Sequence, residues 1–299
     1  SSNTQTVYGI YTVGTGSNTF TGNTISKLTN SSTGALGYID GIYVAEGSNT
    51  IINHTVRDLT IANNNSAITY QTAVGGIVTK SSANQIIKGN TIYNLSNTYS
   101  GFTGQVAGII SAGANTSANI VSENFINRLS VNSTNTASIA GISILSGASE
   151  CYNNIISIGN FVPTTVYGIY EASNSYTNNL HFNSVQISGD PTSGSTSSYA
   201  LYTSANTNAR SIRNNIFANT RANYGTATGS HYAAYLNFTT ATNLTLNNND
   251  YYVSGTGTVL GRYNGADVTA LPIVATKDAN SLSINPGYIK WWSDCRNIQ

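Results

Sequence analysis

The stretch QVAGIISAGANTSANIVSENFINRLS, residues 105–130, contains both halves of the repeat that decides the fold. Its first half is a small residue followed by an aliphatic one, Gly108-Ile109. Its second half is Asn124-x-Ile126, with Leu129 three positions further on. The apolar pieces are short, rich in β-branched residues and separated by Ser, Gly and Asn. That combination is typical of short strands joined by turns.

Both halves recur through most of the chain. The first half recurs as Gly9-Ile10, Gly41-Ile42, Gly76-Ile77, Gly108-Ile109, Gly141-Ile142, Gly168-Ile169, Ala200-Leu201 and the degenerate Ala234-Tyr235. The second half recurs at Asn23, His54, Asn90, Asn124, Asn153, Asn183, Asn215 and Asn249. Helical repeats of similar length need amphipathic pieces of about ten residues or more, and a propeller blade needs four longer strands. The sequence therefore predicts an all-β fold, a right-handed parallel β-helix solenoid of about eight coils.

The repeat also predicts the domain organisation. Residues 1–255 are expected to form the coils, and residues 256–299 an irregular C-terminal cap. Equivalent positions of successive coils stack at about the spacing of paired strands. The Asn residues are expected at a turn, where Asn tolerates the left-handed backbone region and stacked amides can form a ladder. The predicted ladder is Asn23, Asn90, Asn124, Asn153, Asn183, Asn215 and Asn249; at His54 it is either broken or continued by an imidazole contact.

The pattern Gly-Ile-x(n)-Asn-x-Ile resembles the parallel β-helix repeat of the pectate-lyase-like superfamily. The stretches Asn249–Tyr252, Tyr263–Gly265 and Lys277–Leu282 resemble the closing segment of large secreted β-helix proteins of environmental bacteria. The resemblance implies an extracellular or cell-surface location. It is specific for the fold and weak for the function, because this fold serves lyases, hydrolases, adhesins and phage fibres alike.

Composition narrows the classes of partner. Only 8% of the residues are charged, against about 25% in ordinary globular proteins, and the formal net charge is +1. Without a basic field, nucleic acid is not an expected partner. No apolar run approaches the roughly 18 residues of a membrane span. Since the sequence contains no Met, we expect a piece of a longer chain.

The acidic residues do not form a catalytic pattern. The eleven acids and three histidines fall at different repeat positions, and no two acids in adjacent coils share a register. Glycosidic cleavage needs two carboxylates within about 5 to 10 Å of each other, so we predict no catalytic residues. Asp250, Asp267 and Asp278 lie in turn-rich sequence and are weak candidates for Ca²⁺; no other cofactor or metal is expected.

Tyrosines provide the strongest functional hypothesis. Tyr11, Tyr43, Tyr170 and Tyr202 lie two positions after the first-half small residue, and Tyr8, Tyr167 and Tyr199 lie just before it. If the aliphatic residue between them points inward, strand alternation sends these rings outward. Outward rings can contact glycans, or they can simply pack on one another to cover the coil.

Two further features have alternative interpretations. Cys151 and Cys295 either form a disulfide or are unrelated. Arg210, Arg213 and Arg221 either form a small basic patch or cluster by chance. The leading hypothesis is a non-catalytic structural or adhesive module, a stalk or adhesin segment of a large secreted or cell-surface protein. Its expected partners are polysaccharides or cell-surface glycans, together with the rest of a longer chain or neighbouring subunits. The alternatives are a carbohydrate-active enzyme, meaning a polysaccharide lyase or glycoside hydrolase, and a self-assembling extracellular filament subunit.

Overall fold

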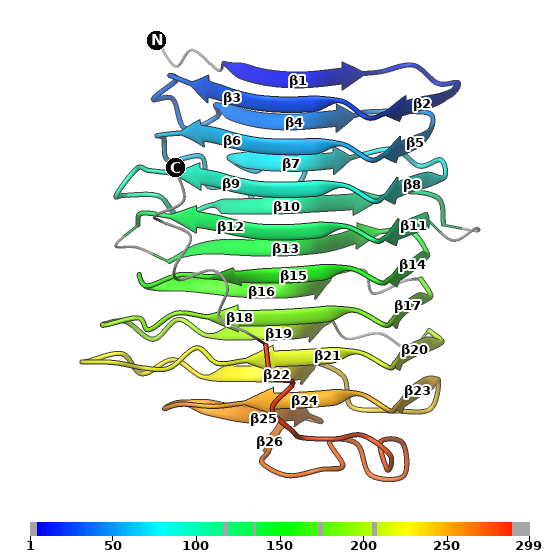
Figure 1. Ribbon diagram of the computed structural model, residues 1–299, viewed down its shortest axis with the longest axis vertical. Coiled ribbons are helices and arrows are strands. Elements are labelled where there is room, and N and C mark those ends of the chain that lie inside the picture. Colours follow the sequence, from blue (N-terminus) through cyan, green and yellow to red (C-terminus); the bar gives the residue numbers. More distant parts are fainter. Residues whose placement is uncertain (1–4, 116–118, 134–135, 173–175, 205–207, 289–299) are drawn as a thin grey trace.

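The chain forms a stack of coils, each made of short strands (Figure 1). The computed structural model describes residues 5–115, 119–133, 136–172, 176–204 and 208–288. All regular structure in these ranges is β-strand, and the strands form three sheets that run along the long axis of the molecule. Cys295, Trp291 and Trp292 lie outside the described residues.

Each coil contributes one strand to each sheet. Sheet A contains β1 (Thr6–Thr12), β4 (Tyr38–Val44), β7 (Val74–Thr79), β10 (Gln105–Ala112), β13 (Ala137–Ser146), β16 (Thr164–Glu171), β19 (Ser198–Thr203), β22 (His231–Leu236), β25 (Thr258–Tyr263) and β26 (Ala266–Val268). Sheet B contains β2 (Ser17–Thr21), β5 (Ser48–Ile52), β8 (Gln85–Lys88), β11 (Asn119–Ser122), β14 (Ser149–Tyr152), β17 (Asn178–His181), β20 (Arg210–Arg213) and β23 (Leu244–Asn247). Sheet C contains β3 (Thr24–Asn30), β6 (Thr55–Ile61), β9 (Thr91–Asn97), β12 (Phe125–Val131), β15 (Ile155–Gly159), β18 (Ser184–Ser188), β21 (Ile216–Asn219) and β24 (Asp250–Val253).

The strands of neighbouring coils pair in parallel and in repeat register. Ile109 of β10, for example, pairs with Ile77 on one side and Ile142 on the other. Sheets B and C contain eight strands each, so that the chain makes about seven turns from the first coil to the last. The predicted all-β parallel solenoid is confirmed.

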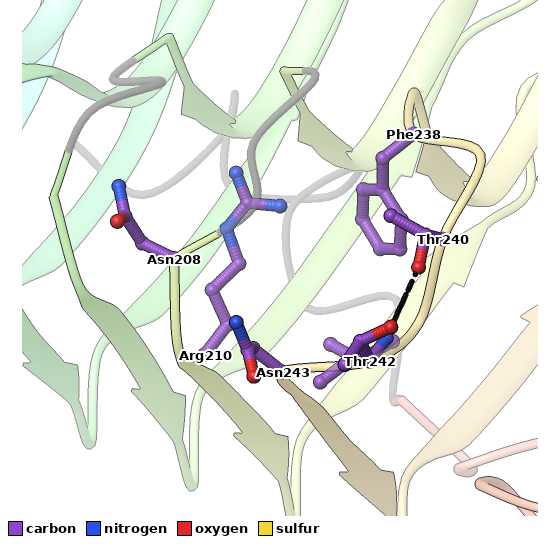
Figure 2. Close-up of a pocket in the computed structure, with 7 residues that line it drawn as sticks. Asn208, Arg210, Phe238, Thr240, Thr242 and Asn243 are labelled. Carbon is purple, nitrogen blue, oxygen red and sulfur yellow. Dashed lines mark hydrogen bonds between the residues drawn. The ribbon is translucent and has the colours of Figure 1, made fainter.

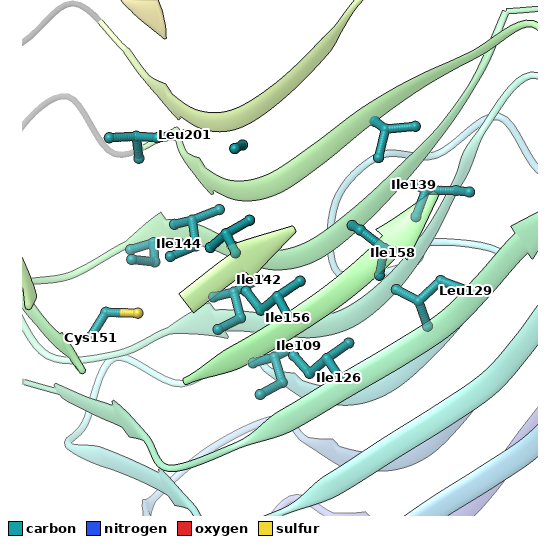
Figure 3. Packing of buried hydrophobic residues seen from close by; sticks show 14 of the residues in the cluster. Ile109, Ile126, Leu129, Ile139, Ile142, Ile144, Cys151, Ile156, Ile158 and Leu201 are labelled. Atoms are coloured by element: carbon teal, nitrogen blue, oxygen red, sulfur yellow. The ribbon is translucent and has the colours of Figure 1, made fainter. Parts of the chain in front are cut away.

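The core is a set of aliphatic columns that run through the middle of the coils (Figure 3). Ile109, Ile142 and Leu201 from sheet A face Ile126 and Ile156 from sheet C, and all five side chains are buried. Burying each such side chain contributes about 1.5–3 kcal/mol. The aliphatic positions of the repeat therefore hold the solenoid together.

The two halves of the repeat are contact partners across each coil. A Cβ atom on Gly108 would lie 2.7 Å from Ile126 Cγ2 and 2.7 Å from the carbonyl oxygen of Gly141. Real side chains do not approach that closely, so any residue larger than glycine must displace a neighbour. The glycine column exists because sheet A lies directly on the first aliphatic column of sheet C.

A column of left-handed residues explains the three-residue spacing in the first four coils. In β3, β6, β9 and β12, one residue before the inward Leu has a positive φ; these residues are Lys27, Asp58, Asn94 and Arg128. Each of them drops out of the pairing register. The extra residue turns the following Leu back into the core. β15 has no such residue, and its inward side chains, Ile156 and Ile158, are only two apart.

The C-terminal end of the solenoid is covered. β25 continues sheet A past residue 255, the expected end of the repeat, and β26 folds back on it as an antiparallel hairpin. Ile273 and Val274 join the core, and Leu282 forms a parallel bridge with Asp250. Among the residues that the structure describes, no helix is long and apolar enough to cross a membrane.

Candidate functional site

The outer face of sheet A carries two groups of tyrosines. Tyr167, Tyr199 and Tyr232 share one register across β16, β19 and β22. Tyr170, Tyr202 and Tyr235 share the register three residues further along the same strands. We call these six residues the C-terminal tyrosine cluster; its members Tyr232 and Tyr235 were missed from the sequence. The N-terminal tyrosine cluster comprises Tyr8, Tyr11, Tyr38 and Tyr43.

Rings of the C-terminal tyrosine cluster stack on one another. Ring centroids are 5.5 Å apart for Tyr199 and Tyr232, with 3° between the planes, and 5.0 Å apart for Tyr202 and Tyr235, with 13° between the planes. Rings of the two columns meet edge to face, for example Tyr199 against Tyr235 at 89°. Because much of each ring face lies against a neighbouring ring, an external partner meets mainly ring edges and hydroxyl groups.

The N-terminal tyrosine cluster is packed in a different way. The hydroxyls of Tyr8 and Tyr38 are hydrogen-bonded at 2.6 Å, and Tyr11 stacks on Tyr43 with centroids 5.7 Å apart. Tyr11 is 52% exposed, but Tyr43 is only 6% exposed. Tyr43 lies on the outer face as predicted, yet Tyr8 and Tyr70 pack in the same apolar cluster, so the expectation that it faces solvent is wrong.

Between the two clusters the outer face is apolar and covered. Val78, Ala107, Ile110 and Ala140 occupy the tyrosine registers in β7, β10 and β13, and all four are fully buried. The tyrosines therefore form two separate surfaces rather than one continuous stripe. Of the two, only the C-terminal tyrosine cluster repeats over three successive coils.

Asp40 is buried on the outer face, in the register of Tyr8 and Gly75. It is fully buried, and neither carboxyl oxygen has a hydrogen-bond partner among the described residues. Burial raises the pKa of this carboxyl well above its usual range. No second acid shares this position in the neighbouring coils, so Asp40 has no carboxylate with which to act.

The weak Ca²⁺ candidates are not brought together. Asp250 accepts a hydrogen bond from the Ile284 amide at 3.0 Å, and Asp267 pairs with Arg262 at 2.6 Å. Asp278 is buried and accepts hydrogen bonds from Ser281 and from the amide of Ile273. Among the described residues there is no group of three or more His, Cys, Asp or Glu side chains that could hold a metal ion.

An asparagine ladder fills the two-residue turn between sheets B and C. Its internal members are Asn90, Asn124, Asn154, Asn183, Asn215 and Asn249, all buried. Each side-chain oxygen accepts the backbone N–H of the preceding coil's ladder residue. Each Nδ2 donates to a carbonyl of the preceding coil, as from Asn154 to Val121 at 2.8 Å. The ladder thus ties each turn to both of its neighbours.

The prediction that Asn153 belongs to this ladder is wrong. It occupies the exposed first position of the turn, where its φ is +54°, and the ladder residue is Asn154. The doublets Asn153-Asn154 and Ile155-Ile156 allow two readings one residue apart. Only one of these places an aliphatic side chain inside: Ile156 is 1% exposed and Ile155 is 51% exposed.

The ladder ends differently at its two ends. His54 continues it: its backbone N–H donates to Asn90 at 2.9 Å, and its Nδ1 accepts the N–H of Asn23 at 3.0 Å. The side chain of Asn23 is exposed and donates to the Thr21 carbonyl at 3.2 Å, within its own turn. At the other end the hydroxyl of Ser281 accepts the Asn249 N–H at 3.0 Å.

A small pocket opens at the corner between sheets A and B. It has a volume of about 250 Å³, and Asn208, Thr240 and Asn243 contribute to its lining (Figure 2). Arg210 also lines the pocket; it is 4% exposed, lies 3.2 Å from Glu171 and stacks over Phe238 at 5.2 Å. Because Glu171 neutralises the arginine, the pocket presents amides and hydroxyls rather than a net charge.

Arg210, Arg213 and Arg221 do not form a basic patch, because they lie at three different corners of the coils. Arg210 and Arg221 are buried, and Arg213 alone is exposed. Arg221 donates to the carbonyls of Thr164 at 2.6 Å and Val162 at 3.0 Å, and burial lowers its pKa to about 10. No sequence pattern signals these contacts, because Arg221 reaches residues 57 and 59 positions earlier in the chain.

Cys151 is a free, buried thiol among the described residues. Burial raises its pKa to about 12, so it is not a nucleophile at neutral pH.

No protein-family model matches the chain, and neither a curated protein nor a solved structure matches it.

Proposed function

We propose that this chain is a non-catalytic structural and adhesive module of an extracellular protein, and that it contacts glycans through the C-terminal tyrosine cluster. The observation that carries the proposal is the alignment of six tyrosines in two registers on the outer face of β16, β19 and β22. Five of the six are partly exposed, whereas Tyr232 is only 6% exposed and its hydroxyl donates to Asp267 at 3.3 Å. A rigid solenoid places the hydroxyls and ring edges of these five at the regular spacing of its strands.

Polar groups beside the cluster support a contact with sugars. Asn237 lies at the edge of the cluster, where its Nδ2 donates to the Tyr202 hydroxyl at 3.3 Å. Arg262 lies over the Tyr235 ring at 5.6 Å. Tyrosine combines an apolar ring with a polar end, a combination suited to the alternating C–H and hydroxyl surface of a sugar.

Other observations support the non-catalytic and extracellular parts of the proposal and disfavour the filament alternative. The carboxylates described above bind their own neighbours or are buried alone. Few charges and many Asn, Ser and Thr residues suit an exposed stalk, as does the resemblance to pectate-lyase-like secreted proteins. The covered C-terminal end is unfavourable for a filament that grows by end-to-end pairing of identical copies, because β26 occupies the free edge of β25.

A glycan array with the double variant Tyr170→Ala, Tyr202→Ala tests the proposal. We expect at least a tenfold loss of binding, while Tyr224→Ala, which removes a 71% exposed tyrosine outside the cluster, leaves binding unchanged. A second pair, Tyr202→Phe with Tyr235→Phe, removes only the hydroxyls and is expected to weaken binding less than the alanine pair. Binding that survives the alanine pair, with the circular dichroism spectrum preserved, would assign the cluster to packing alone.

A further inference from the structure

The first coil leaves its interior side chains uncovered. Four of its core positions are only half-buried, whereas the same positions one coil later are fully buried; the fifth, Ile25, is 7% exposed. The half-buried residues and their fully buried counterparts are Val7 and Ile39, Ile10 and Ile42, Phe20 and Ile51, and Leu28 and Leu59. Three strand edges, those of β1, β2 and β3, surround this apolar surface, and each begins its sheet.

The ladder is open at the same end. In every internal member Nδ2 reaches the preceding coil; for Asn90 the acceptor is the carbonyl of Ile51. Asn23 instead donates to Thr21 of its own turn. The first coil thus has a ladder residue whose donor lacks the acceptor that a preceding coil supplies elsewhere.

We propose that the N-terminal end of the solenoid is a stacking face for one further coil of the same repeat, carried by the polypeptide on the N-terminal side of β1. A coil of the same repeat is the expected occupant, because the surface that the first coil exposes is the one that every later coil presents to the coil before it. Such a coil would run parallel to β1, β2 and β3. It would place aliphatic side chains over Val7, Ile10, Phe20 and Leu28, and its ladder residue would donate its backbone N–H to Asn23.

The path of the chain favours this source. Each later parallel strand of sheet A is reached from the sheet C strand of the coil before it. The residue just before β1 already occupies the position that this path requires: the Gln5 carbonyl accepts Asn30 Nδ2 at 2.9 Å, as the Gly37 carbonyl accepts Asn63 Nδ2 at 2.8 Å. A preceding coil would therefore join β1 through the same type of sheet C to sheet A connection that the later coils use.

An inserted coil tests the proposal. A copy of residues 72–103, which span one repeat, is inserted directly before Gln5 of the full chain. We expect a rise of at least about 5 °C in the thermal midpoint, because nearest-neighbour interfaces add to the stability of a solenoid. Amides of β1, β2 and β3 are expected to exchange with solvent at least tenfold more slowly. The control carries Ile→Asp substitutions at the inserted copies of Ile77, Ile87 and Ile92, and it is expected to give neither effect.

Several results would overturn the proposal. The insert can be degraded by protease while the rest of the chain stays folded, or it can fold without slowing exchange in β1–β3; in either case the face does not accept a coil. The unmodified chain is also measured by light scattering. A dimer that Phe20→Asp converts to a monomer would show that the occupant is a second copy of this chain.

Discussion

Replacing Asn154 by alanine tests the register of the asparagine ladder. The Asn154 side chain accepts hydrogen bonds from Asn124 N at 3.1 Å and Asn124 Nδ2 at 2.9 Å. It donates to the Val121 carbonyl at 2.8 Å and to Asn183 Oδ1 at 2.9 Å. Four buried hydrogen bonds at about 1 kcal/mol each give a loss of about 4 kcal/mol, and the Asn124 N–H left unpaired adds to it.

Thermal unfolding followed by circular dichroism measures the effect. A loss of about 4 kcal/mol corresponds to a midpoint lower by about 8 °C in a chain of this size. The neighbouring Asn153 is the matched control, because it is exposed and makes its contribution through a left-handed φ. Asn153→Ala is expected to cost about 1 kcal/mol, and Asn153→Gly close to nothing. A larger loss for Asn153→Ala than for Asn154→Ala would refute the ladder register.

Three further predictions concern other buried positions. Asp40→Asn is expected to stabilise the protein by an amount that grows with pH. Folding raises the pKa of the Asp40 carboxyl, so the wild type has its full stability below about pH 4. Above that pH it loses up to about 1.4 kcal/mol per pH unit until the pH reaches the folded-state pKa. Urea unfolding at pH 4, 6 and 8 measures this gap, and a gap that does not change with pH contradicts the assignment. Gly141→Ala is expected to lower the thermal midpoint by several degrees, because its Cβ would lie 2.6 Å from Ile156 Cγ2 and 2.6 Å from the Gly168 carbonyl oxygen. An unchanged midpoint would argue against the close approach of sheets A and C. Ile109→Asp buries an unpaired charge and is expected to lower the free energy of unfolding by several kcal/mol. Ile155→Asp, at an exposed position, is expected to have little effect. Equal losses in urea unfolding would mean that the inward and outward faces are assigned wrongly.

Periodicity was enough to predict the solenoid, because its glycine, aliphatic and asparagine positions are each set by a contact that recurs in every coil. Gly108 and Ile126 stand in the sequence as separate signals, and the fold shows that each requires the other. Predictions failed where two residues of the same type are adjacent. Asn153 and Asn154 satisfy the pattern equally well, and only the burial of Ile156 decides between them.

The tyrosine surface could be predicted only in part. Alternation along the strand places Tyr43 on the outer face, but it does not reveal that Tyr8 and Tyr70 cover it. Tyr232 and Tyr235 were missed because the last repeat was aligned on Ala234-Tyr235, whereas Ala234 pairs with Leu201. The ion pair of Glu171 and Arg210 joins the end of β16 to the start of β20 at the corner between sheets A and B, and no local sequence pattern announces it.

The ladder also decides where this chain can change length. The turn that it fills has two residues in every coil, whereas the connections from sheet C to sheet A range from four residues (160–163) to twelve (62–73). Two such connections, 189–197 and 220–230, lie on one another through backbone hydrogen bonds such as Tyr224 N to Pro191 O at 3.0 Å. A peptide grafted at Gly194 or Gly225, both exposed, would extend from a corner that carries no ladder contact. The molecule can therefore serve as a scaffold that displays peptides: the asparagine ladder keeps its turn constant, and the sheet C to sheet A connections beside the tyrosines vary in length.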